Sequence, residues 1–211
     1  MARRSLLGAL IGGVLAACQG PPDGVRTPPR TAADSQAAHV AAVAAAGGTV
    51  DSILPVAVAL ARFRDGLDQV DTLRYAAASR EALVDRWARA VSASDTATLN
   101  TLLVDRAEFA WLYYPGSRMS LPPYEAPPGL LWGQLLASSN EGASQVLRRH
   151  GGRPFRVAAL RCPAPPVAEG ENRLHERCEV RVNAAGTPTR LFGTILERDG
   201  RFKFLGYANP L

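Results

Sequence analysis

Apolar residues recur at helical spacing through the middle of the chain. The clearest case follows Ser79, a typical N-cap, with Glu81 in the first turn. Its apolar positions, three and four residues apart, are Leu83, Val84, Trp87, Ala88 and Val91. Further helices are predicted over residues 53–64, from Asp95 onward, from Pro128 to about Ala137, and from Asn140 to His150. The middle of the chain is therefore predicted to be helical.

The period changes to two in the last sixty or so residues, which is typical of strands. Strands are predicted over residues 155–160, 178–183, 191–198 and 202–207, and Asp199-Gly200 between the last two is a strong hairpin signal. An aromatic run, Glu108 to Tyr114, is also β-like and stops at Pro115-Gly116. Helices followed by an antiparallel meander indicate the α+β class.

The polar segment Glu169 to Arg173 lies between two predicted strands. A segment of this kind can contact a partner, but a solvated turn explains it more simply.

The chain begins with Arg3-Arg4 followed by an apolar stretch, Leu6 to Ala17, and then Cys18. The stretch is shorter than the roughly 20 residues that span a bilayer. A basic start, a short apolar run and small residues are typical of an export signal. A short buried helix is the alternative, but the polar, proline-rich stretch after Cys18 offers nothing for it to pack against.

The run Leu15-Ala16-Ala17-Cys18 resembles the lipobox of bacterial lipoproteins. This resemblance implies cleavage before Cys18 and lipid on its sulfur, so that the membrane is a partner through that lipid. It further implies an exported protein, on the outer membrane facing the periplasm if the host has two membranes. The export route, general or twin-arginine, stays open.

The expected organisation is a signal peptide over residues 1–17, a flexible Ala/Pro-rich tether over 18–49, and a single α+β domain over 50–211 with its core in 79–208. Within the tether, the alanine-rich run 36–46 is expected to be helical.

Charge and cysteine content narrow the function classes. Removing residues 1–17 lowers the formal charge from +5 to +3, and the arginines alternate with acids, which argues against nucleic acid as a partner. Cys162 and Cys178 are expected to pair as a disulfide in an oxidising compartment, two buried thiols being the alternative. Two cysteines without a close histidine pair do not make a metal site.

The order of elements resembles the opening of the nuclear-transport-factor-2-like superfamily, which includes ketosteroid isomerases and SnoaL-like cyclases. The resemblance rests on residues 79–90, 95–103 and 108–111 and covers about 79–208. It implies helices packed on a curved, mostly antiparallel sheet of four to five strands, a cone-like half-barrel with a pocket at its mouth. The acid and tyrosine that the isomerases use for catalysis have no matching positions here.

Five side chains are candidates for the wall of such a pocket: Glu108, Trp111, Tyr113, Tyr114 and Trp132. Aromatic residues with polar tips suit apolar ring or lipid ligands. The alternative is that they form the core between the aromatic run and the helices. Glu108 can serve as an acid or base if it is buried, whereas a solvated strand end is the simpler expectation.

The histidines do not form a catalytic or metal-binding set in sequence. His39 lies in the tether, His175 in a predicted loop, and His150 at a predicted helix end, where a cation complements the helix dipole. No cofactor is indicated.

The sequence therefore favours a lipid-anchored, noncatalytic domain that binds an envelope protein or a small apolar ligand. An isomerase- or hydrolase-type enzyme that uses the cone pocket is one alternative, and a structural module of envelope assembly is another.

Overall fold

The computed structural model describes residues 32–48 and 54–208, and the chain divides into two units, Met1–Ser52 and Ile53–Leu211. The predicted signal peptide and Cys18 lie outside these residues, as do residues 18–31 and 49 of the tether. The alanine-rich run is helical as predicted and forms α1, Ala32–Ala45. Within the described ranges, no helix is both long and apolar enough to cross a bilayer.

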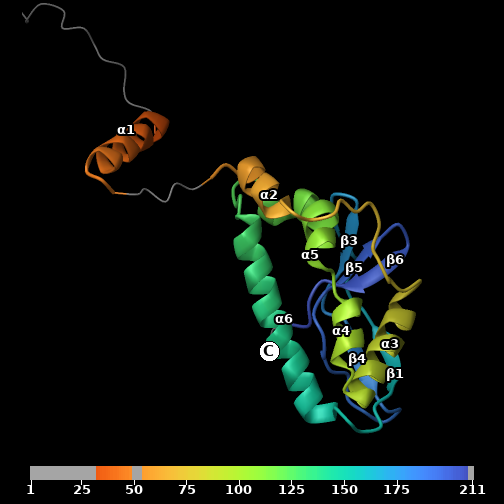
Figure 1. Cartoon of the computed structure of the whole chain (residues 1–211). Helices are drawn as coiled ribbons and strands as arrows, with labels where there is room; N and C mark the ends of the chain where they lie inside the picture. The colour runs from red at the N-terminus through yellow and green to blue at the C-terminus, as the bar shows by residue number, and fades with distance from the viewer. Residues whose placement is uncertain (1–31, 49–53, 209–211) are drawn as a thin grey trace, which may run out of the picture. The chain divides into compact units, whose positions relative to one another are not determined.

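The second unit begins with helices (Figure 1). Its α-helices are α2 Val56–Arg64, α3 Arg80–Ala93, α4 Thr96–Leu102, α5 Arg106–Glu108 and α6 Pro128–His150. The predicted cap at Ser79 is confirmed, because its side chain accepts a hydrogen bond from the backbone N–H of Ala82. Asp95, the predicted start of the next helix, caps α4 by accepting a hydrogen bond from the backbone N–H of Thr98.

Over the described residues six strands follow, and they form two antiparallel sheets. They are β1 Val157–Arg161, β2 Val167–Glu169, β3 Asn172–His175, β4 Glu179–Val182, β5 Ile195–Arg198 and β6 Arg201–Phe204. One sheet pairs β1 with β4, and the other has the order β2-β3-β5-β6. The hairpin at Asp199-Gly200 is confirmed, with φ of 50° and 68° at these two residues, as a tight two-residue turn requires.

The α+β class, with helices packed on antiparallel sheets, is confirmed, and the sheets do not close into a barrel. In Figure 1 the long helix α6 runs beside α4 and α3, with the strands beyond them. Two apolar clusters hold these layers together. One surrounds Trp87, whose ring packs edge-on against Phe155 and Phe192, and the other surrounds Phe109.

The strand predicted over Glu108–Tyr114 is wrong, because this segment is helical. It continues α5 as a π-helix, Phe109–Tyr113, and then as a 3₁₀ turn, Tyr114–Gly116. A capping box starts it, in which the Asp105 carboxylate accepts from the Glu108 N–H and the Glu108 carboxylate accepts from the Asp105 N–H. Aromatic residues favour strands in isolation, but here their burial on one helical segment overrides that preference.

Two further predictions need correction. Residues 128–150 form one helix, α6, rather than two, since Asn140 is exposed and does not interrupt the helix. The segment Glu169–Arg173 contains the expected solvated turn at Gly170 and Glu171, both exposed, but the residues on either side of it are not solvated. It joins β2 to β3 in a hairpin, and it carries two buried polar side chains, Glu169 and Asn172, 6% and 1% exposed.

The structure joins Cys162 and Cys178 in a disulfide, the expected pairing. Cys162 follows β1 and Cys178 precedes β4, so the bond ties together the ends of the two strands of the smaller sheet.

Gly142 of α6 is expected to tolerate no side chain. A Cβ there would lie 2.1 Å from the Tyr207 carbonyl oxygen, so the chain after β6 would have to move. Gly142→Ala is expected to lower the free energy of unfolding by about 1–3 kcal/mol, the cost of overpacking. Chemical denaturation measures this change.

Gly133 provides the matched control, because it lies in the same helix and a Cβ there meets nothing within 4 Å. Gly133→Ala is expected to stabilise the protein by roughly 0.5–1 kcal/mol through helix propensity. Equal effects of the two substitutions would contradict the close packing of α6 on the C-terminal segment.

Candidate functional site

Glu108 is fully buried, contrary to the expectation of a solvated strand end. Its carboxylate accepts hydrogen bonds from the backbone N–H groups of Arg74 (2.5 Å) and Asp105 (2.8 Å). It also pairs with the Lys203 ammonium at 2.7 Å.

Lys203, the only lysine of the chain, extends from β6 and is 2% exposed. The Glu108–Lys203 ion pair is buried and its carboxylate oxygens are fully hydrogen-bonded, so it is a structural element of the core. The Glu108 carboxylate already accepts from three donors, and it therefore lacks the open position that a general acid or base needs.

The aromatic candidates pack around one ring, that of Phe109. The Phe109 ring centroid lies 5.8 Å from that of Tyr113, 5.7 Å from Tyr114 and 5.2 Å from Trp132. Tyr114 is fully buried, and its hydroxyl donates to the Ala126 carbonyl at 2.6 Å, while burial raises its pKa. The structure thus brings these residues together as a core. The sequence left open whether they form a core or the wall of a pocket.

Trp111 stands on the rim of this core. The Arg64 guanidinium stacks over its ring at 3.8 Å and donates to the neighbouring Ala110 carbonyl. Burial lowers the pKa of Arg64. The contact is a cation–π interaction that closes this side of the core.

Tyr113 lies among buried polar side chains next to the β2–β3 hairpin. Burial raises its pKa to about 12, and Ser117 and Glu169 are its hydrogen-bonding neighbours. One carboxylate oxygen of Glu169 is buried without a hydrogen-bond partner, as are the Asn172 side-chain oxygen and Arg198 Nε. The Asn172 amide and Arg198 both donate to the Leu112 carbonyl, which ties the hairpin to the π-helix.

His175 and His150 make structural contacts in the second unit. His175 lies on β3, where its Nε2 is 2.7 Å from a Glu197 carboxylate oxygen and its Nδ1 is 3.5 Å from Arg80 Nη1. Because a guanidinium only donates, Nδ1 accepts there and Nε2 carries the proton. His150 ends α6 as predicted and stacks on Phe155. In the described part of the chain, no group of histidines, cysteines and acids is placed to hold a metal ion.

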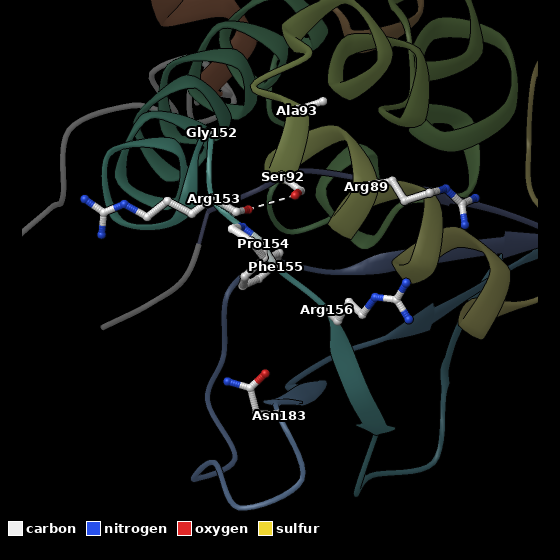
Figure 2. A pocket seen from close by; sticks show the side chains of 9 residues that line it. All are labelled: Arg89, Ser92, Ala93, Gly152, Arg153, Pro154, Phe155, Arg156 and Asn183. Carbon is white, nitrogen blue, oxygen red and sulfur yellow. Dashed lines mark hydrogen bonds between the residues drawn. The ribbon is translucent and has the colours of Figure 1, made fainter.

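A cavity of about 610 Å³ opens at the other end of the unit, where α3 and α6 end and β1 begins. We name it the arginine cavity (Figure 2). Its lining residues are Arg89, Ser92, Ala93, Gly152, Arg153, Pro154, Phe155, Arg156 and Asn183. They come from the last turns of α3, the loop before β1 and the end of β4, and none of them is an acid.

The wall of the arginine cavity is held by specific contacts. The Ser92 hydroxyl donates to the Arg153 carbonyl at 2.7 Å, which fixes the loop to α3 (Figure 2). Phe155 is buried against Trp87 and anchors the loop between two exposed arginines, Arg153 and Arg156. The loop is therefore positioned by the core while its charges face outward.

The arginines of the cavity were not among the candidates from the sequence. Arg89 is 64 residues from Arg153 and Asn183 follows another strand, so no local motif joins them. One signal in the sequence could have indicated this site. Four arginines, Arg148, Arg149, Arg153 and Arg156, lie close together around the predicted helix stop at Gly151-Gly152.

Comparison with protein-family models, with curated proteins and with solved structures finds no match to this chain.

Proposed function

We propose that this protein is a lipid-anchored cell-envelope protein whose folded unit binds a partner without carrying out a reaction on it. Residues 1–17 serve as its export signal, and lipid on Cys18 holds it at the membrane. The noncatalytic part of this proposal is carried by one observation, that the acid among the candidate residues is closed off. Glu108 is bonded to Lys203 and two backbone N–H groups inside the core.

The binding surface in this proposal is the arginine cavity. Its volume of about 610 Å³ falls in the range of known ligand sites. By contrast, the aromatic residues that would favour a small apolar ligand fill the core around Phe109. A polar, positively charged ligand site therefore fits the unit better than an apolar one.

Metabolic labelling with palmitate tests the anchor. The chain, produced in a bacterium that makes lipoproteins, is expected to incorporate the label, and Cys18→Ala is expected to abolish incorporation. Two lipid chains contribute about 0.8 kcal/mol for each buried CH₂, so the labelled chain should remain in the membrane fraction.

The double variant Cys162→Ala/Cys178→Ala is the control, because it removes the other two cysteines and leaves Cys18. It should be labelled like the natural chain. Label that persists in Cys18→Ala would contradict the proposed attachment.

A further inference from the structure

The arginine cavity carries positive charge that the protein itself does not neutralise. Arg153 and Arg156 are exposed, and within the described ranges neither side chain forms an ion pair. Arg89 forms an ion pair with Asp85, which lies one turn before it on α3. Two guanidinium groups therefore remain free to bind an anion.

The neighbouring His150 responds to this charge. Burial lowers its pKa, and repulsion by Arg149 and Arg153 lowers it further. Of these two arginines only Arg153 lines the cavity, so the charge at the end of α6 comes partly from the cavity and partly from the helix itself.

The directions of the arginines indicate the shape of the ligand. Arg89 and Arg156 extend to one side of the loop before β1, and Arg153 extends to the opposite side (Figure 2). Arg153 and Arg156 thus present guanidinium groups on opposite sides of the loop, which favours a ligand with anionic groups at separate points. The planar fork of a guanidinium suits phosphate oxygens, which it binds through two parallel hydrogen bonds.

We propose that the arginine cavity binds a ligand that carries two or more phosphate groups, one held by Arg156 and another held by Arg153. This rests on the proposed binding function and names its ligand class. The Asn183 side chain, which lines the cavity opposite α3, is a further donor for the same ligand.

Isothermal titration calorimetry of the full chain in neutral detergent tests the proposal, with sodium tripolyphosphate and orthophosphate as probes. Tripolyphosphate should bind more tightly than orthophosphate, and Arg153→Glu/Arg156→Glu should weaken tripolyphosphate binding by about tenfold or more. Both side chains are exposed, so this variant is expected to keep its fold, which circular dichroism verifies.

Arg62→Glu/Arg201→Glu is the matched control, because it makes the same change in charge at two exposed arginines that do not line the cavity. It should leave tripolyphosphate binding unchanged. No binding of tripolyphosphate at millimolar concentration would overturn the proposal, and so would an equal loss in the control, which would indicate nonspecific attraction. Palmitate labelling of Cys18 does not depend on this result. The experiments can therefore reject the lipid anchor and the phosphate-bearing ligand independently of each other.

A second arm distinguishes a lipid headgroup from a free phosphate compound. Cardiolipin, a lipid with two phosphate groups, is added to the detergent micelles, and native mass spectrometry counts the molecules bound. Cardiolipin binding that is lost in Arg153→Glu/Arg156→Glu would support a lipid as the source of the phosphates. Tripolyphosphate binding without cardiolipin binding would support a free phosphate compound.

Discussion

Replacing Lys203 by methionine is expected to lower the free energy of unfolding by about 3–5 kcal/mol. The substitution leaves the Glu108 carboxylate buried, with two backbone donors but without its counter-ion at 2.7 Å. The cost is the desolvation of that charge, which the ammonium group offsets in the natural chain. Chemical denaturation of the two proteins measures the difference.

Two further variants separate the ion pair from general damage to the strand. Arg201→Met changes an exposed cation of the same strand, β6, and should alter stability by no more than about 0.5 kcal/mol. The double variant Glu108→Leu/Lys203→Met removes both charges, so its loss should be smaller than the sum of the two single losses. Purely additive losses would contradict the role of Lys203 as the partner of Glu108.

Removing the disulfide is expected to have the next largest effect. Cys162 and Cys178 are 16 residues apart, and closing a loop of this length contributes about 3 kcal/mol in the chain-entropy model. The variant Cys162→Ala/Cys178→Ala should therefore unfold at a lower denaturant concentration. Cys178 is also 1% exposed in the core around Trp87, so the loss includes some packing.

Cys18→Ala is the control for this measurement, because it leaves the bonded pair intact. An unchanged unfolding midpoint in the double alanine variant would show that the bond does not stabilise the native state. The sequence already indicated this pair, because two cysteines remained once Cys18 was set aside for lipid.

The elements that the sequence predicted well are those in which local signals agree. In α3, the cap at Ser79 and the apolar stripe through Trp87 both indicate the same helix. The hairpin at Asp199-Gly200 was likewise predictable from two residues that accept positive φ.

The failures occurred where distant contacts decide the structure. The aromatic run from Glu108 to Tyr114 has the composition of a strand, yet it is helical because its rings pack around Phe109 and its start is held by a capping box. Likewise, the burial of Glu108 depends on Lys203, 95 residues later in the chain. No local pattern contains that information.

The candidate site was missed for a related reason. Its charges come from α3 and from the loop before β1, and only the fold places these segments around one cavity. The sequence shows interleaved arginines and acids, which indicates a mixed surface. The structure shows that Asp85 pairs with Arg89 of the cavity, while Arg153 and Arg156 remain exposed and form no ion pair within the described residues.

Native mass spectrometry of the chain extracted from membranes in mild detergent tests the central claim, a lipid-anchored binding unit, most directly. The account predicts a polypeptide that begins at Cys18, carries the added mass of its lipid, and is two hydrogens lighter than its dithiol form. A phosphate-bearing ligand retained in the same spectrum would add support. A chain that begins at Met1 and carries no lipid would contradict the account.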